Sequence, residues 1–234
     1  HVDSYAEKMR RAGMSERVVA CFRQYYLQYR HGTLSTEIRD EDILPPNAAH
    51  MAAWDSLPPV ADAVAALAPV VMIKLNGGLG TSMGLSRAKS LLPVKGGLTF
   101  LDVIARQALA TGVRLLFMNS FATREDTLTH LAAYPELRRD GLPLDFVQHQ
   151  FPRLRVDTGE PLSLGDDRDW NPPGHGDIYL ALQNDRLLER LIGSGSRYAF
   201  ISNSDNLGAL PDARIAAYMA RDRVPFLLEV CQRG

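Results

Sequence analysis

The architecture of this chain is most clearly indicated by the stretch Val70-Val71-Met72-Ile73-Lys74-Leu75-Asn76-Gly77-Gly78-Leu79-Gly80. A short apolar run that ends in a glycine-rich turn is typical of a buried strand. Four glycines stand among the eight residues from Gly77 to Gly84, so backbone N–H groups there can approach the phosphate oxygens of a ligand. Taken alone, the turn fits a ligand-free connection from strand to helix equally well.

Strands and helices alternate beyond this turn. We predict further strands at 113–118, 144–148, 198–202 and 225–230, and helices at 99–109, 123–134, 177–192 and 212–221. Two of these helices begin with capping-box spacing, in which Thr99 precedes Asp102 and Thr123 precedes Asp126. The alternation predicts an α/β fold, a Rossmann-like domain with a mixed, mostly parallel sheet and helices on both faces. Ligands of such sheets lie beyond the carboxyl ends of the strands.

The first 69 residues show a different pattern, without alternating strands and helices. Apolar residues recur at helical spacing between Ser4 and Arg30 with one interruption near Gly13, which indicates two short helices or one kinked helix. Prolines punctuate the connector that follows. We therefore expect residues 1–69 to form an N-terminal helical extension and residues 70–234 to form the main domain.

Composition excludes several classes of protein. The 234 residues are 46% hydrophobic and carry a formal net charge of -1, which gives no general attraction to nucleic acid or to an anionic membrane. The most apolar stretch, Val60 to Leu75, is too short and too interrupted to cross a bilayer, and no secretion leader is visible. Cys21 and Cys231 stand far apart without a CxxC pair, so we expect a reducing, cytoplasmic location. The sequence gives no indication of the oligomeric state.

The glycine turn departs from two common phosphate-binding motifs. No lysine and hydroxyl follow the glycines at P-loop spacing, and no acidic residue completes a G-x-G-x-x-G dinucleotide pattern. Arg87-Ala88-Lys89-Ser90 instead supplies two cations shortly after the turn. A lysine at this point can neutralise phosphate charge, although a single cation is more often only a solvated surface group.

Three further segments carry chemistry. Pro172-Pro173-Gly174-His175-Gly176-Asp177 predicts a rigid turn into a helix start that favours an anion, with Asp177 as a candidate N-cap and His175 as either a ligand or an exposed turn residue. Asp205 follows the predicted strand at 198–202, where one carboxylate with phosphate oxygens suits Mg²⁺; the alternative is a plain polar turn. Gln148 ends another predicted strand, and its amide can both donate and accept.

These motifs together resemble the UTP:glucose-1-phosphate uridylyltransferases, or UDP-glucose pyrophosphorylases, of the eukaryotic type. The resemblance is carried, in order, by Lys74 to Gly84, Lys89-Ser90, Leu98 to Asp102, Met118 to Phe121, Gln148 with Phe151-Pro152-Arg153, Trp170 to Tyr179, and Ser202 to Ala209. It spans about residues 70–231. The chain departs from the family pattern at Arg87-Ala88, where Gly-Pro is usual, and at Ser204, where isoleucine is common.

The resemblance implies a role for each candidate site residue. The nucleotide would be bound by Leu75, Asn76, Gly77, Gly78, Lys89, Gln148 and Gly174. Within this set, Gln148 would contact the uracil and Gly174 the uridine. The sugar phosphate would be bound by His175, Asn203, Ser204 and Asp205. Lys89 and Asp205 would be the catalytic residues, and Asp205 would also hold Mg²⁺.

The resemblance also implies a reaction. In it, UTP and glucose 1-phosphate give UDP-glucose and pyrophosphate by a Mg²⁺-dependent in-line attack on the α-phosphorus, without a nucleic-acid or membrane partner. Residues 70–234 would then be a nucleotide-binding catalytic domain truncated at its C-terminal end, and we expect this fragment alone to turn over poorly. Two alternatives stay open: a related pyrophosphorylase for another sugar 1-phosphate, and a non-catalytic UTP-binding fragment.

Overall fold

The computed structural model describes residues 1–33, 37–45, 47, 51–79 and 87–231. The chain forms two compact units, unit 1 (His1–Pro46 and Gln148–Ala181) and unit 2 (Asn47–Val147 and Leu182–Gly234). The N-terminal helices therefore share a unit with residues 148–181, and the units do not coincide with the expected boundary between residues 69 and 70. Within the described ranges, no helix combines the length and the hydropathy that crossing a bilayer requires.

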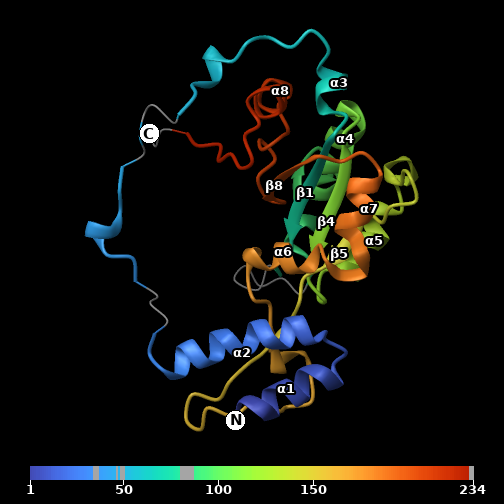
Figure 1. The fold of residues 1–234 in the computed structure, drawn as a ribbon. Coiled ribbons are helices and arrows are strands. Elements are labelled where there is room, and N and C mark those ends of the chain that lie inside the picture. Colours follow the sequence, from blue (N-terminus) through green and yellow to red (C-terminus); the bar gives the residue numbers. More distant parts are fainter. Residues whose placement is uncertain (34–36, 46, 48–50, 80–86, 232–234) are drawn as a thin grey trace. The chain divides into compact units, whose positions relative to one another are not determined.

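Unit 2 is built on a four-stranded parallel sheet in the order β5-β4-β1-β8 (Figure 1). Its strands are β1 (Val70–Asn76), β4 (Arg114–Asn119), β5 (Asp145–Val147) and β8 (Tyr198–Asn203). A small antiparallel pair, β2 (Pro93–Lys95) with β3 (Leu98–Thr99), precedes the second strand of the sheet along the chain. The predicted α/β, Rossmann-like fold with a mostly parallel sheet is confirmed.

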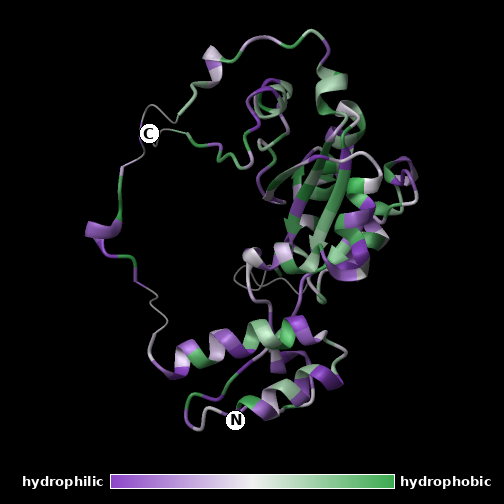
Figure 2. Ribbon diagram, in the orientation of Figure 1, coloured by the Kyte–Doolittle hydropathy of each residue, from purple (hydrophilic) through white to green (hydrophobic). Residues whose placement is uncertain are grey.

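Helices cover the sheet of unit 2. They are α3 (Ala63–Leu67), α4 (Phe100–Thr111), α5 (Arg124–Leu131), α7 (Leu187–Gly193) and α8 (Ala213–Asp222). Met72 of β1 and Phe117 of β4 belong to one core cluster with residues of α4, α5 and α8. Ile73 and Leu116 point to the opposite face and are also buried, so both faces are covered. Figure 2 accordingly shows β1 and β4 as largely hydrophobic.

Helix α4 begins as predicted, whereas α5 does not. Thr99 and Asp102 form a capping box, and Gly112 ends the helix with a φ of 71°. Burial raises the pKa of the Asp102 carboxyl, but hydrogen bonds from Thr99, Tyr134 and His130 outweigh this effect and hold the pKa below its usual range. The capping box predicted at Thr123 is not formed. The Thr123 hydroxyl instead donates to the backbone oxygen of Asn76.

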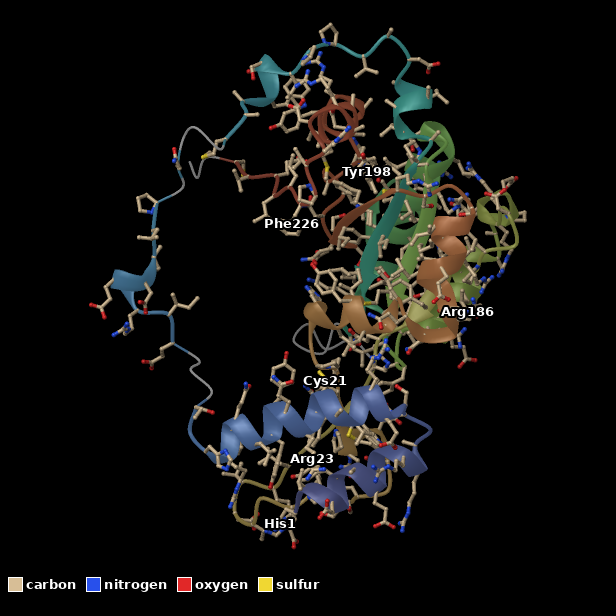
Figure 3. The ribbon with its side chains drawn as sticks, viewed as in Figure 1. His1, Cys21, Arg23, Arg186, Tyr198 and Phe226 are labelled. Carbon is tan, nitrogen blue, oxygen red and sulfur yellow. The ribbon has the colours of Figure 1, made fainter. Side chains whose placement is uncertain are left out.

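Two predicted elements are wrong. The helix expected at 177–192 is divided into α6 (Ile178–Ala181) and α7. Arg186 (Figure 3), directly before α7, adopts a φ of 55°, through which an α-helix does not continue. The strand expected at 225–230 carries no regular structure and pairs with no strand among the described residues. Phe226, labelled in Figure 3, is 65% exposed, because the alternating apolar residues of this segment have no sheet to cover.

Unit 1 joins the N-terminal helices to a later segment of the chain. The helices are α1 (Val2–Arg11) and α2 (Glu16–Arg30), which confirms two helices rather than one kinked helix. Tyr5, Phe22 and Tyr26 form an aromatic cluster whose neighbours include Phe151 of β6 (Phe151–Pro152) and Trp170 of β7 (Trp170–Asn171). The Tyr5 and Tyr26 hydroxyls both donate to the Gly159 oxygen at 3.2 Å.

The remaining elements are single turns of 3-10 helix. They are η1 (Asp40–Asp42), η3 (Trp54–Ser56), η5 (Lys89–Leu91), η6 (Pro135–Leu137), η7 (Asp167–Asp169), η8 (His175–Asp177) and η9 (Asn184–Arg186). Two of them, η5 and η8, contain residues of the candidate site.

Candidate functional site

The carboxyl ends of the four strands of unit 2 are aligned. In the parallel register, Leu75 pairs with Asn203, Asn76 with Asn119, and Asn119 with Val147. Gln148 follows Val147 directly in the chain. The sheet therefore brings Leu75, Asn76 and Asn203 to the edge at which ligands of parallel α/β sheets bind.

The glycine loop after β1 closes on itself within the described residues. Leu79 forms an antiparallel bridge with Ala88, and the Lys89 backbone N–H donates to the Gly78 oxygen at 3.2 Å. Gly80 and residues 81–86, which belong to the same predicted loop, lie outside the described residues. The closure returns Lys89 to the side of Gly77 and Gly78, so the predicted cation and the predicted amides are neighbours.

Lys89 meets the second predicted catalytic residue in an ion pair. Its Nζ donates to Asp205 Oδ2 at 2.8 Å, and the side chains are 43% and 41% exposed. Asp205 lies in the turn that follows β8, directly after Ser204, which is buried and donates its N–H to the Leu75 oxygen. The structure thus brings Lys89, Asp205 and the glycine loop together in unit 2, with both charges accessible to a ligand.

The Asn76 side chain is turned into the interior. It is 2% exposed, and its Nδ2 donates to Asn119 Oδ1 at 2.8 Å and to Thr127 Oγ1 at 2.9 Å. The Thr123 hydroxyl donates to the Asn76 oxygen at 2.8 Å. The Asn76 side chain therefore fixes the start of the glycine loop to β4 and α5, and its amide nitrogen is not directed at a ligand.

This buried network extends to a second layer that the sequence reasoning missed. Asn119 Nδ2 donates to Asp145 Oδ2 at 3.2 Å, and Arg124 Nε donates to the same oxygen at 2.9 Å. Asparagine, threonine and aspartate at the ends of buried strands are the signal that indicates such a network, since buried polar groups require partners. Lys74, a charged residue within the apolar run of β1, is a second signal of this kind that the sequence reasoning missed.

The other candidate residues belong to unit 1. Gln148 is buried, whereas Gly174 and His175 are exposed at the start of η8. Gly174 has a φ of 107° and a ψ of 177°, a conformation reserved for glycine. These residues are therefore presented by a turn whose shape depends on the absence of a side chain at position 174.

Asp177 fixes this turn to the segment that carries Gln148. Its Oδ2 accepts the His149 backbone N–H at 2.6 Å, and its Oδ1 lies 2.9 Å from His149 Nδ1. The Asp177 side chain is 1% exposed. The candidate N-cap thus bonds to a distant segment of unit 1, and it aligns residues 148–149 with residues 174–177.

A metal site made by the protein alone is absent from the part of the chain that the structure describes, where no group of three or more His, Cys, Asp or Glu residues converges. Asp205 offers one accessible carboxylate. Magnesium commonly takes one or two carboxylates and completes its coordination with phosphate oxygens and water. The residues present therefore fit a magnesium ion that arrives with a phosphate ligand.

The fold is the Rossmann-like α/β fold of nucleotidyltransferases. The family model for UTP--glucose-1-phosphate uridylyltransferase matches residues 19–234, and the chain belongs to this family. The predicted family resemblance is confirmed.

Sequence identities to individual relatives support the family assignment. The chain is 39% identical over 191 residues to UTP--glucose-1-phosphate uridylyltransferase of Solanum tuberosum, which covers 76% of this chain and 39% of the relative. It is 34% identical over 244 residues to the Hordeum vulgare protein of the same name, with 98% of this chain and 51% of the relative covered. The chain thus spans about half, or less, of the length of these relatives.

Solved structures show the same relationship. A mutant UDP-glucose pyrophosphorylase from Leishmania major, in complex with UDP-glucose, superimposes with a TM-score of 0.89 at 39% identity. The match covers 100% of this chain and 50% of the Leishmania major chain. A second mutant of that enzyme, also in complex with UDP-glucose, gives a TM-score of 0.88.

Proposed function

We propose that this chain is the nucleotide-binding part of a uridylyltransferase that makes UDP-glucose and pyrophosphate from UTP and glucose 1-phosphate. The observation that carries the proposal is the pairing of Lys89 with Asp205 beside the glycine loop, at the carboxyl edge of a parallel sheet. Membership of the uridylyltransferase family supports the choice of nucleotide and sugar phosphate.

In the proposed reaction, a phosphate oxygen of glucose 1-phosphate attacks the α-phosphorus of UTP. A new oxygen–phosphorus bond forms in line with the bond that breaks, and pyrophosphate leaves with that bond's electron pair. No protein nucleophile is required, so the residues act by positioning the two substrates and by neutralising charge.

The proposed nucleotide contacts divide between backbone and side chains. Leu75, Asn76, Gly77 and Gly78 offer backbone groups to the nucleotide, since the Asn76 amide is already occupied. Lys89 neutralises charge on the triphosphate and on the leaving pyrophosphate. Gln148 selects uracil through its amide, and Gly174 lines the uridine site.

The proposed sugar-phosphate contacts come from His175, Asn203, Ser204 and Asp205. His175 and Asn203 are exposed, which allows their side chains to orient the sugar phosphate. Ser204 is buried, so we assign it to backbone contacts or to packing beneath the site. Asp205 would hold Mg²⁺, and the bound ion would offset the negative charge of the phosphates.

Three broader features complete the proposal. We assign residues 1–69 to an N-terminal extension and residues 70–234 to the catalytic domain of the whole enzyme, as the sequence suggests. We also propose a cytoplasmic location, which is consistent with Cys21 and Cys231 as free thiols.

Ligand-dependent thermal stability tests the nucleotide part of the proposal. UTP with Mg²⁺ should raise the midpoint of unfolding, because a ligand at about 100 times its Kd adds roughly 2.7 kcal/mol to the free energy of unfolding. ATP and GTP should stabilise the chain much less. Lys89→Ala should lower UTP affinity about tenfold or more, as expected for loss of a charge-assisted contact. The exposed Lys95→Ala provides the matched control.

Product analysis tests the reaction. The chain, and a form of it extended to the length of its relatives, are incubated with UTP, Mg²⁺ and glucose 1-phosphate, galactose 1-phosphate or N-acetylglucosamine 1-phosphate. UDP-glucose should be the main product. Equal stabilisation by all three nucleotides, or a preference for another sugar phosphate, would contradict the assignment.

A further inference from the structure

Lys74 is a buried cation in β1, one of the two inner strands of the sheet of unit 2. Its side chain is 0% exposed, and its strand neighbours in register are Phe117 on β4 and Ser202 on β8. Removing an ammonium group from water is costly unless hydrogen bonds replace the lost hydration. An apolar side chain of similar length would fill this position in the core at a lower cost, so the presence of lysine calls for an explanation.

The ammonium group of Lys74 has three hydrogen-bond acceptors around it. Its Nζ donates to the Ala209 oxygen at 2.7 Å, to Ser202 Oγ at 2.9 Å and, more weakly, to the Asn206 oxygen at 3.5 Å. The same nitrogen lies 5.9 Å from the centre of the Phe200 ring. Three acceptors match the three N–H donors of a lysine. Among the described residues, no carboxylate forms an ion pair with Lys74.

These three acceptors lie on both sides of Asp205. Ser202 is in β8 before it, whereas Asn206 and Ala209 follow it in the turn. The turn is also attached to the sheet by the Ser204 N–H, which donates to the Leu75 oxygen, and to α4 by Gln107 Nε2, which donates to the Leu207 oxygen. The ion pair of Asp205 with Lys89 attaches it to the return of the glycine loop. Backbone hydrogen bonds span shorter steps of the turn, from Asn206 to Asn203 and from Ala209 to Asn206. Lys74 adds a contact that ties its beginning, at Ser202, directly to its end, at Ala209.

We propose that Lys74 is a positioning residue, whose buried ammonium group holds the turn at residues 202–209 in the shape that presents Asn203 and Asp205 at the carboxyl edge of the sheet. The inference rests on the proposed function for the roles of Asn203 and Asp205. Lys74 touches neither substrate nor metal in this assignment. It acts through the Ser202 hydroxyl and the backbone oxygens of the turn, in contrast to Lys89, whose exposed ammonium group pairs with Asp205.

Lys74→Met is the informative variant, because methionine keeps a long unbranched stem but removes the charge and the three donors. Ile73→Val is the matched control. Ile73 directly precedes Lys74 in the same strand, its side chain points to the opposite face of the sheet, and the substitution leaves the turn untouched. Ser202→Ala is a milder variant that removes one acceptor and keeps the lysine.

Hydrogen exchange tests the positioning without any ligand. In Lys74→Met, amide protons of residues 203–209 should exchange about tenfold faster, while those of β1 and β4 keep their rates, as expected for local loss of hydrogen bonds. Ile73→Val should leave the turn unchanged. Unchanged exchange of residues 203–209 in Lys74→Met would overturn the inference, whatever the substrate of the protein.

Calorimetric UTP titrations with and without Mg²⁺ test the consequence for the site. The unchanged chain should gain UTP affinity when Mg²⁺ is added, and Lys74→Met should lose most of this gain, about tenfold, while its Mg²⁺-free affinity changes less than about twofold. A full Mg²⁺-dependent gain in Lys74→Met would overturn the inference. Absence of the gain in the unchanged chain would instead count against the proposed function.

Ser202→Ala keeps the test decisive if Lys74→Met does not fold. In this variant the Mg²⁺-dependent gain in UTP affinity should be about threefold smaller, and the amide protons of residues 203–209 should exchange faster, as expected for the loss of one hydrogen bond. Exchange and gain that both match the unchanged chain would overturn the inference through this variant.

Discussion

Lys89 Nζ and Asp205 Oδ2 lie 2.8 Å apart, although the two residues are separated by 116 positions in the chain. The pair joins the return of the glycine loop to the turn after β8. Because the two side chains are 43% and 41% exposed, water screens the attraction, and such pairs contribute only about 0–1 kcal/mol to folding. A weak, accessible pair of opposite charges can exchange partners when a phosphate and a cation arrive together.

The first prediction separates folding from binding at this pair. Lys89→Met and Asp205→Asn should each change the free energy of unfolding by less than about 1 kcal/mol in urea titrations. Without Mg²⁺, Asp205→Asn should bind UTP a few times more tightly, because it removes a negative charge and releases Lys89. With Mg²⁺, the order should reverse in favour of the unchanged chain. Weaker Mg²⁺-free binding by Asp205→Asn would contradict the partner exchange.

The second prediction concerns Asp177 in unit 1. Asp177→Asn should lower the free energy of unfolding by about 1–3 kcal/mol, because a buried carboxylate that accepts two hydrogen bonds from His149 is replaced by an amide with one acceptor. Asp157→Asn is the matched control, since its pair with Arg155 is exposed and should contribute little. Equal effects of the two substitutions in urea titrations would show that the His149 contact is not needed for the fold of unit 1.

The third prediction uses the backbone of Gly174. Gly174→Ala should cost about 1–3 kcal/mol of local strain, because alanine rarely adopts a φ of 107°. A Cβ at this position meets no atom within 4 Å, so crowding is not the cause. Gly176→Ala also meets open space without a positive φ and is the control. Gly174→Ala should bind UTP more weakly than the unchanged chain, whereas Gly176→Ala should not. Equal UTP affinities of the two variants would exclude a role for the backbone conformation of Gly174 in binding.

The fourth prediction is a pH dependence. Burial lowers the pKa of Lys74 to about 8. Between about pH 8 and about pH 10 the unfolded chain, whose lysine has an ordinary pKa, binds a proton that the folded chain does not. The free energy of unfolding should therefore rise across this range, by at most about 3 kcal/mol. The difference between the unchanged chain and Lys74→Met, measured by urea titration at each pH, isolates this contribution, and a difference that stays constant would contradict it.

The sequence was sufficient for elements whose signals are local. The apolar run before Gly77 and the Thr99–Asp102 capping box both act within a few residues, and the structure has them as predicted. Thr123 shows why a local signal can fail. Its hydroxyl has a long-range acceptor in Asn76, 47 positions away, and this contact replaces the cap.

Longer-range arrangements could not be predicted from spacing. The apolar residues at 225–230 have the alternation of a strand, but a strand also requires a paired neighbour, which this segment lacks among the described residues. The contact between Lys89 and Asp205 depends on the return of the glycine loop, for which the sequence carries no distance information. Lys74 was visible as a cation in an apolar run, yet only the fold shows which acceptors surround it.

The division of unit 1 between two distant segments has a consequence for biosynthesis. The aromatic cluster of α1 and α2 finds its partners Phe151 and Trp170 only after more than 100 further residues have been made. While the ribosome is producing β1, β4 and β5, the apolar side of the α1–α2 pair lacks these two partners. Exposed apolar surface on a nascent segment favours aggregation, and burying it here requires closure of a long loop, which slows assembly.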